Sequence, residues 1–296
     1  MKDQLLFLGY GKILIPRKEL FCENPVENGI AVKITRPVFD NPPFSSEFLE
    51  KLQNEAMLQN YGSIQICQTL LEALDLNKSE SKFFDMCAAP GGKTAYLLSK
   101  LQSWKFFAGD KPSRAPLIKK NISKISKSES VEIITGDSAQ TKFGDKFFDA
   151  ILLDAPCSAT GSRPKGKTFN CLNKILRLIQ DLNFKLIRFS GVQNSMSDRQ
   201  LKSYQKLQRK LFHEAHRLLK NDGVLVFSTC SVRTEENNDN VKYFLEKYSD
   251  LICEKTVYFN PFELKNKTIS GIIHIETSGK TDTIGFFCAR FRKKIS

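Results

Sequence analysis

The stretch FFDMCAAPGGKTAYLLSK, residues 83–100, joins a short apolar run to a glycine turn and then to a helical pattern. A phosphate-binding P-loop has the same order of elements, but its pattern requires a glycine five positions before Gly92. Cys87 occupies that position, and Pro90 lacks a backbone N–H that could bind a phosphate. The stretch therefore predicts a strand, a tight turn and a helix that bind something other than a nucleoside triphosphate.

Apolar runs and helical patterns alternate from residue 82 onward. Short, nearly continuous apolar strands separated by helices are typical of a parallel sheet that helices cover on both faces. We therefore predict an α/β protein with a doubly wound sheet. The predicted strands are the runs KFFDMCA, WKFFAGD, VEIITGD, FFDAILLDAP, GVLVFSTCS and DTIGFFCARF.

The composition is that of a folded α/β protein with a strong positive charge. Of its 296 residues, 41% are hydrophobic and 26% are charged, which is enough to bury one large core. Residues 5–50 are short apolar segments cut by Gly, Pro and Asn, and we expect a small N-terminal piece there. The net charge of +13 and the pI near 9.3 favour a polyanionic partner.

The cysteines do not form a recognisable metal or disulfide pattern. No two of them have C-x-x-C spacing, so we expect no metal site and no disulfide scaffold, and reduced thiols fit a cytoplasmic protein. The apolar run at the N-terminus is too short for a signal peptide, and no stretch is long enough to span a membrane. The eight cysteines stand at positions 22, 67, 87, 157, 171, 230, 253 and 288.

Five polar residues stand where predicted strands end. Cys87, Asp110, Asp137, Asp154 and Cys230 lie at or just past the carboxyl ends of apolar runs. A single aspartate at such a place is usually a helix cap or a turn residue, and a single cysteine is usually a small core residue. The carboxyl edge of a doubly wound sheet is, however, where such folds bind ligands. Taken together, the five residues predict a ligand site.

The first two loops of this edge suit a ligand that carries a nucleoside. Gly91 and Gly92 let the backbone approach a ligand closely, and Asp110 is placed to accept hydrogen bonds from a ribose diol. An NAD enzyme is compatible with this arrangement, although the G-x-G-x-x-G spacing is absent.

Two further motifs each place a cysteine in a polar turn after a buried strand. They are LLDAPCSATGSRPK, residues 152–165, and VFSTCSVRTEEN, residues 226–237. In the usual order of this fold the two strands are neighbours, about 5 Å apart, so both cysteines are expected to share one cleft.

These motifs resemble those of the RsmB/Nop/Sun family of RNA cytosine-5 methyltransferases. That family has a Gly-rich motif like residues 85–94, an Asp-Ala-Pro-Cys motif like 154–157 and a Ser-Thr-Cys motif like 228–230. The resemblance spans roughly residues 55–291. It implies a Rossmann-like methyltransferase fold with a mostly parallel, seven-stranded sheet, S-adenosyl-L-methionine as the cofactor and RNA as the partner.

Finer features resemble the sixth NSun subfamily, which modifies a cytosine near the 3′ end of certain transfer RNAs. They are GSRPK after the first cysteine motif, YQKLQRKLFHEA at 204–215 and DTIGFFCARF at 282–291. Residues 7–21 resemble the segment that links the subfamily's RNA-binding PUA domain to its catalytic domain. We therefore expect residues 1–54 to be a remnant of that linker region without most of the PUA domain, and residues 55–296 to be a monomeric catalytic domain.

The resemblance also implies the roles of four catalytic residues. Carbon 5 of cytosine is too electron-poor to attack a methyl group, so a thiolate must first add to carbon 6. Cys230 is implied to be that thiolate, and Cys157 is implied to assist its release, as a base or as the organiser of one. Asp154 is implied to hold or protonate the edge of the base, with support from Lys93.

The remaining implied roles concern the cofactor. Asp110 is expected to bind its ribose, Asp137 its adenine amino group and residues 87–93 its methionine end, while a helix cap remains the ordinary role for each aspartate. The expected cofactor-binding residues are Cys87, Ala88, Ala89, Pro90, Gly91, Gly92, Lys93, Asp110, Asp137 and Asp154.

Two alternatives and one unassigned segment remain. A DNA-type cytosine-5 methyltransferase would use Cys157 as its nucleophile and would not require Cys230, and an inactive RNA-binding protein would keep the basic charge but lose a motif residue. Residues 162–202 form a basic insert with nine Lys or Arg against two Asp, and its helical pattern at 168–189 fits either an RNA-contacting helix or a packed helix with a solvated basic face.

Overall fold

A mostly parallel β-sheet runs through the computed structural model, which describes residues 6–10, 31–34, 56–123, 125, 128–161, 196–255, 272–275 and 286–295. The order of strands across the sheet is β10-β11-β8-β7-β4-β5-β6, and β9 also pairs with β11. The strands are β4 (Lys82–Asp85), β5 (Lys105–Asp110), β6 (Val131–Thr135), β7 (Phe148–Asp154), β8 (Leu219–Thr229), β9 (Leu251–Glu254), β10 (Ile272–Ile275) and β11 (Phe286–Lys293).

The pairing of these strands confirms the predicted doubly wound sheet. Strands β4 to β8 pair with one another in parallel, whereas β11 is antiparallel to β8. β10 pairs with β11 at 286–289 and β9 pairs with it at 290–293, so the two share one edge of β11 and the sheet is seven strand positions wide. The chain order reverses between β4 and β7, and this reversal places a ligand crevice at the carboxyl ends of these strands.

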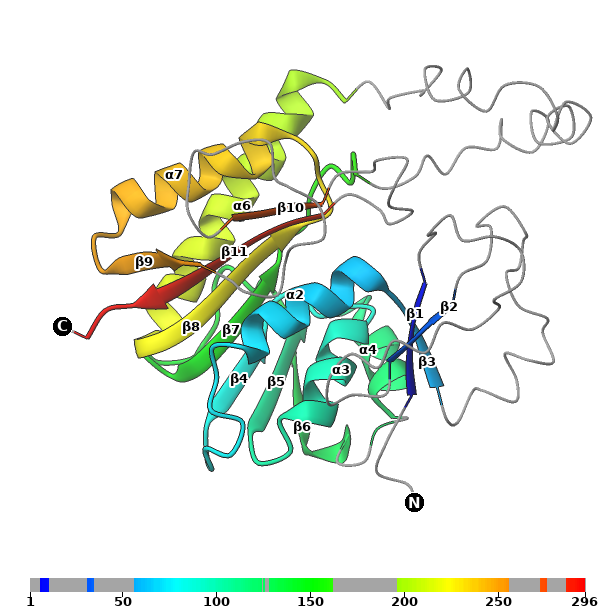
Figure 1. The fold of residues 1–296 in the computed structure, drawn as a ribbon. Helices are drawn as coiled ribbons and strands as arrows, with labels where there is room; N and C mark the ends of the chain where they lie inside the picture. The colour runs from blue at the N-terminus through cyan, green and yellow to red at the C-terminus, as the bar shows by residue number, and fades with distance from the viewer. Residues whose placement is uncertain are drawn as a thin grey trace, which may run out of the picture.

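Helices cover both faces of the sheet (Figure 1). One face carries α2 (Tyr61–Leu71), α3 (Gly92–Lys100) and α4 (Ala115–Ile122). The other face carries α6 (Asp198–Leu218) and α7 (Asn238–Lys247), and short 3-10 turns lie at η1 (Ser128–Ser130) and η2 (Thr234–Glu236). No helix in the described part of the chain is long and apolar enough to cross a bilayer.

Alternation of phenylalanines along the strands builds the two halves of the core. Phe83 and Phe106 face α2 and α3, with ring centroids 5.0 Å apart. Phe84 faces α6, where Phe212 stacks on the Phe244 ring of α7 at 3.5 Å between centroids. Burying each such side chain contributes about 1.5–3 kcal/mol, so these rings fix the positions of the strand ends that carry the polar residues.

Strand β11 ties the beginning of this domain to its end. Arg290 of β11 is only 6% exposed, and its guanidinium pairs with Glu72 just after α2 at 2.9 Å. The same group donates to the backbone carbonyls of Thr69 at 3.0 Å and Lys255 at 2.7 Å. The strand therefore joins helix α2 to the segment after β9.

A second, smaller sheet contains three parallel strands. Its order is β2 (Ala31–Ile34), β1 (Leu6–Tyr10), β3 (Ala56–Asn60). The predicted boundary between residues 54 and 55 lies outside the described residues, as do residues 162–195 of the basic insert with the helical pattern at 168–189. These predictions stay untested.

Candidate active site

The glycine turn after β4 is held in place by backbone hydrogen bonds. Gly91 has a φ of 103° and caps α3, and a Cβ at this position would lie 3.2 Å from the Cα of Ile118 on α4. Glycine is therefore required both by the left-handed backbone and by the close approach of α4. The Gly91 N–H donates to the Ala88 carbonyl at 2.6 Å, and the Ala88 N–H donates to the Gly109 carbonyl at 2.9 Å.

The same hydrogen bonds show why this turn is not a P-loop. A P-loop points successive N–H groups at a phosphate, but here those of Ala88 and Gly91 bond to carbonyls and that of Ala89 donates to Asp110 Oδ2 at 2.9 Å. Pro90 has no N–H. The N–H groups of the first turn of α3, which have no intrahelical acceptor, remain for a ligand.

Gln59 is a polar residue of this loop region that the sequence analysis missed. Its side chain is buried, with 6% exposed, and neither polar atom of its amide has a hydrogen-bond partner among the described residues. The amide nitrogen lies 3.6 Å from where a Cβ at Gly92 would be, so it sits beside the first turn of α3. An unpaired buried amide is unfavourable, and a polar group of a ligand at this turn would satisfy it. No spacing in a single sequence marks Gln59.

The two acids expected to bind a nucleoside end neighbouring strands. Asp110 is 6% exposed, and its oxygens accept the N–H groups of Ala89 and, at 2.8 Å, Lys111. Asp137 has a 57% exposed side chain, accepts the Ala139 N–H at 3.0 Å and lies 3.5 Å from Lys210. Both also make the local turn contacts common for strand-end aspartates, while each carboxylate oxygen keeps a further lone pair for a ligand.

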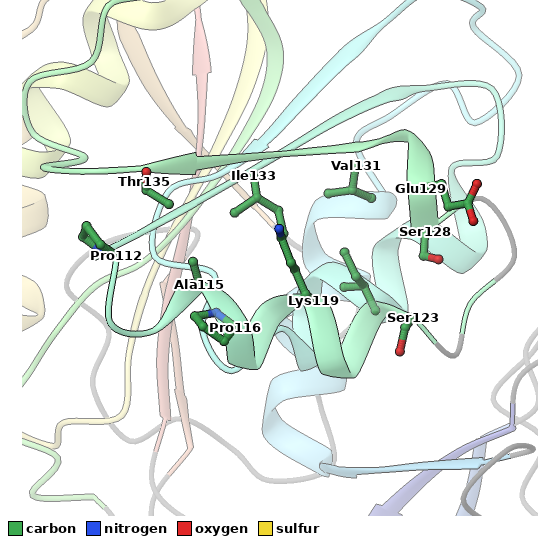
Figure 2. A pocket seen from close by; sticks show the side chains of 11 residues that line it. Pro112, Ala115, Pro116, Lys119, Ser123, Ser128, Glu129, Val131, Ile133 and Thr135 are labelled. Carbon is green, nitrogen blue, oxygen red and sulfur yellow. The ribbon is translucent and has the colours of Figure 1, made fainter.

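A groove of about 610 Å³ lies between α4 and β6, and none of the expected catalytic or cofactor-binding residues lines it (Figure 2). Pro112 and Thr135 border one end, two residues from Asp110 and Asp137 respectively, while Ser128 and Glu129 border the other. The groove therefore runs away from the carboxyl edge of the sheet along its outermost strand.

Lys93 and Asp154 form an ion pair between the glycine turn and the first cysteine motif. Lys93 Nζ lies 2.6 Å from Asp154 Oδ2, and the hydroxyl of Ser228 donates to Asp154 Oδ1 at 2.7 Å. Burial acts to lower the pKa of Lys93, but the attraction and hydrogen bond of Asp154 outweigh it and hold the pKa above its usual value. Lys93 is thus a charged donor at the point where the two loops meet.

A second acid lies beneath this pair. Asp85 is 1% exposed and accepts the Thr94 hydroxyl at 2.7 Å through Oδ2, while Oδ1 has no hydrogen-bond partner in the part of the chain that the structure describes. Burial raises the pKa of Asp85 from 3.8 to about 7, against the lowering effects of Thr94 and Lys93. The sequence analysis counted Asp85 only as the first residue of the Gly-rich motif.

The two motif cysteines meet at the ends of neighbouring strands. Asp154 pairs with Ser228 in the register of β7 and β8, and this brings Cys157 Sγ to 3.1 Å from Cys230 Sγ. The backbone N–H of Cys230 also approaches Cys157 Sγ, at 3.3 Å. The hydrogen bond to Cys230 and burial raise the pKa of Cys157 well above its usual range, and either sulfur can be the donor in this contact.

The family called 16S rRNA methyltransferase RsmB/F matches residues 71–181 and 184–292 of the chain. The chain belongs to this family. The family match confirms the resemblance found from the motifs at 85–94, 154–157 and 228–230.

Relatives in this family differ in the RNA that their names specify. The chain is 31% identical over 257 residues to human tRNA (cytosine(72)-C(5))-methyltransferase NSUN6. This alignment covers 82% of the chain and 47% of that protein. It is 32% identical over 196 residues to ribosomal RNA small subunit methyltransferase B of Yersinia pestis, covering 66% of the chain and 39% of that protein. The chain thus spans about half the length of the human relative and less than half the length of the Yersinia relative.

Solved structures show the same fold. NSun6 from Pyrococcus horikoshii with SFG superimposes with a TM-score of 0.63 at 23% identity, over 92% of the chain and 62% of that protein. A methyltransferase homologue from Pyrococcus horikoshii gives 0.62 at 23% identity, over 88% of the chain and 74% of that protein. The Rossmann-like methyltransferase fold is therefore confirmed.

Within this RsmB/F domain, the expected site residues fall into two groups. Lys93 pairs with Asp154 and Cys157 contacts Cys230, while Ser228, two residues before Cys230, donates to Asp154. The expected cofactor residues lie along the same edge on the loops after β4, β5 and β6, and Cys87 packs against the core on the α6 side. Their binding roles stay predictions.

Proposed function

We propose that this chain is the catalytic part of an RNA cytosine-5 methyltransferase that uses S-adenosyl-L-methionine and acts on a transfer RNA. The observation that carries the proposal is the pair of thiols 3.1 Å apart beside the Lys93–Asp154 ion pair, at the carboxyl edge of a methyltransferase fold. The choice of transfer RNA follows the human NSUN6 match, which covers more of the chain than the ribosomal RNA enzyme does.

The loops after β4, β5 and β6 fit the expected cofactor. The free N–H groups at the start of α3 and the unpaired Gln59 amide suit a carboxylate or amino group at the glycine turn. Asp110 and Asp137 would hold the ribose and the adenine, and the relative from Pyrococcus horikoshii holds SFG, an analogue of S-adenosyl-L-methionine. When bound, the cofactor supplies a methyl group for carbon 5 of the base.

Cys230 begins the reaction by adding to carbon 6 of the cytosine. Its sulfur forms a bond to carbon 6 and the electron pair of the ring double bond moves toward carbon 5, which then becomes nucleophilic. The protonated thiol of Cys157, 3.1 Å away, favours ionisation of Cys230 by donating a hydrogen bond to its sulfur. The contact itself is symmetric, and Cys230 is assigned as the nucleophile because it stands in the Ser-Thr-Cys motif.

Asp154 and Lys93 bind the polar edge of the base. Both observed partners of the Asp154 carboxylate, Lys93 and the Ser228 hydroxyl, are donors, so the carboxylate is suited to accept a hydrogen bond from the exocyclic amino group. The Lys93 ammonium is the charged donor that stabilises negative charge on the ring during the addition.

Cys157 becomes available as a base only after Cys230 has reacted. The largest contribution that raises its pKa is the hydrogen bond to Cys230, and that bond is lost when the Cys230 sulfur is attached to carbon 6. Cys157 can then give its proton to solvent and, as a thiolate, accept the proton of carbon 5; the electron pair left on carbon 5 re-forms the ring double bond, and the Cys230 sulfur leaves carbon 6 as a thiolate. The pair thus changes roles within one reaction cycle.

Single and double substitutions of the thiols test this division of roles. With transfer RNA and S-adenosyl-L-methionine, Cys157→Ala should accumulate a protein–RNA adduct that survives denaturing electrophoresis and shrinks on ribonuclease treatment. Cys230→Ala and the double variant should form none, and all three should lose turnover. Cys253→Ala, a half-buried cysteine of β9, is the control and should keep wild-type turnover.

Two results would overturn the proposal in different ways. An adduct that accumulates only when Cys230 is removed would make Cys157 the nucleophile, as in DNA-type enzymes. Wild-type protein that transfers no labelled methyl group to total RNA would remove the proposed activity. Because the proposed reaction needs both thiols reduced, we propose a cytoplasmic location, and the monomeric state expected from the sequence stays a prediction.

A further inference from the structure

One buried carboxylate contacts both loops that carry the proposed catalytic thiols. Glu236, in the 3-10 turn η2, is 0% exposed. Its Oε1 accepts the backbone N–H of Ser158 at 2.9 Å, and its Oε2 accepts the hydroxyl of Ser231 at 2.5 Å. The Ser158 hydroxyl also donates to Oε2. Ser158 follows Cys157 directly, and Ser231 follows Cys230.

Helix α6 completes the set of donors around this carboxylate. The amide of Gln208 donates to Glu236 Oε1 at 3.0 Å and to the carbonyl of Pro156, the residue before Cys157, at 2.9 Å. Asn240 of α7 donates to the Gln208 oxygen at 2.8 Å and so fixes which end of that amide faces Glu236. Gln208 and Asn240 are both 0% exposed.

The geometry points to Glu236 as a positioning residue that sets the separation of the Cys157 and Cys230 sulfurs. All four donors converge on two oxygens, and an ionised carboxylate is an acceptor only, so the group can bond to both loops at once without competition. The inference rests on the proposed function, because it concerns the alignment of the thiols for that reaction.

The rate of the proposed reaction depends on this alignment of the two thiols. Cys230 must reach carbon 6 and Cys157 must reach the proton on carbon 5, so a displacement of either loop affects a different step. A misplacement of about 1 Å at a reacting group can reduce the rate about 100-fold. Among the described residues, the hydrogen bonds of the Glu236 carboxylate run to the two cysteine loops and to α6, and none runs to the glycine turn or to the loops with Asp110 and Asp137, so cofactor affinity should not depend on it.

Two substitutions of Glu236 separate positioning from folding. Glu236→Gln can keep one oxygen for the Ser158 N–H and Gln208, and its NH₂ can donate to hydroxyls that turn around, so this variant should fold. We expect turnover to fall about 100-fold in Glu236→Ala, with partial recovery in Glu236→Gln, and with KM for RNA and Kd for the cofactor unchanged. Glu235→Gln, at the adjacent and less buried residue, is the matched control.

Two serine substitutions keep the test valid if Glu236→Ala does not fold. Ser158→Ala loosens the Cys157 loop and should slow release, so adduct accumulates as in Cys157→Ala. Ser231→Ala loosens the Cys230 loop and should slow adduct formation without accumulation. Ser203→Ala, an exposed serine of α6 whose hydroxyl bonds to the Gln200 carbonyl, should change neither step.

A cross-linking rate measures the thiol separation without any RNA. Dibromobimane reacts with two neighbouring thiols, forming two thioether bonds and releasing two bromide ions and two protons. In a Cys67→Ala, Cys288→Ala background, which removes a buried cysteine pair, bridging of Cys157 to Cys230 should be at least several-fold slower in Glu236→Gln than with Glu236 intact. Cys157→Ser should abolish the bridge.

The outcomes distinguish this inference from the proposed function. Slower bridging in a protein that methylates no RNA supports the positioning role and rejects the function. Wild-type turnover in folded Glu236→Ala, or equal bridging rates in the two proteins, rejects the positioning role and leaves the function standing. The positioning role would also be overturned if Ser158→Ala and Ser231→Ala slowed the same step of the reaction. Glu236 would then stabilise the site in general and would not position each cysteine loop separately.

Discussion

The loop after β4 and the two loops after β7 and β8 meet at one edge of the sheet, but they are held by different groups. The loop after β4 is fixed by backbone hydrogen bonds, by the conformation of Gly91 and by the side chains of Asp110, Arg114 and Asn121, which follow it closely in the chain. The two cysteine loops are fixed largely by side chains that converge on Glu236. A loop that depends on its own backbone conformation can be predicted from the glycine and proline in its sequence. A loop held by side chains from distant positions has no such local sequence pattern.

The largest expected effect concerns the acid beneath the glycine turn. The folded-state pKa of Asp85, about 7, lies above the ordinary 3.8, so the folded protein holds this proton more tightly than the unfolded chain. Ionisation of Asp85 should therefore reduce the free energy of unfolding as pH rises from about 4 to 7, by on the order of 4 kcal/mol. Asp85→Asn should remove this decline.

Urea unfolding of both proteins at a series of pH values measures the Asp85 effect. The difference in free energy of unfolding between Asp85→Asn and wild type should rise across that window and then level off. Thr94→Val, which removes the hydroxyl donor but keeps the acid, should retain the decline. A difference that does not vary with pH would show that the backbone-held loop tolerates a charged Asp85 beneath it.

The next effect lies where the two regions touch, at the Lys93–Asp154 pair. Lys93→Met keeps most of the apolar stem but removes the charged donor, so turnover should fall about 10²–10³-fold, as for loss of one preorganised donor. The Kd for S-adenosyl-L-methionine, measured by calorimetry, should change far less. Lys120→Met on the exposed side of α4 is the control. Equal losses of turnover and cofactor affinity would show that Lys93 acts in cofactor binding at the glycine turn and not on the base.

The smallest of these effects concerns the glycine turn itself. Gly91→Ala introduces a Cβ at a φ of 103° and 3.2 Å from the Ile118 backbone, which should destabilise the fold by about 1–3 kcal/mol. Gly144→Ala has nothing within 4 Å of its new Cβ and should be neutral or slightly stabilising. Similar melting temperatures for the two variants would contradict a loop held by its backbone.

The same contrast explains how much of the molecule could be predicted from its sequence. Apolar runs gave the strands, and the polar residues at their ends, such as Asp110 and Cys230, do lie at the carboxyl edge of the sheet. The strands can be predicted from the spacing and type of their apolar residues, because a strand that is buried on both faces accepts few residue types.

What could not be predicted depends on partners far apart in the chain. Ser158 and Glu236 are separated by 78 residues, and no local spacing connects them. Helix α7 begins only at Asn238, after the 3-10 turn η2 that carries Glu236. Asn237 has a non-helical backbone, with φ −111° and ψ −95°, and its side chain instead accepts from Thr229 at 2.6 Å and donates to Ser231 at 2.9 Å.

Strand β11 has a consequence for the order in which this domain can assemble during synthesis. Every other strand of the large sheet precedes residues 286–293 in the chain, yet β11 lies between β8 and the pair β9 and β10. Until those residues leave the ribosome, the edge of β8 that leads to Cys230 has no neighbour on that side, and Arg290 cannot join α2 to the segment after β9. The two cysteine loops can therefore reach their final positions only after β11 has been synthesised and has paired with β8.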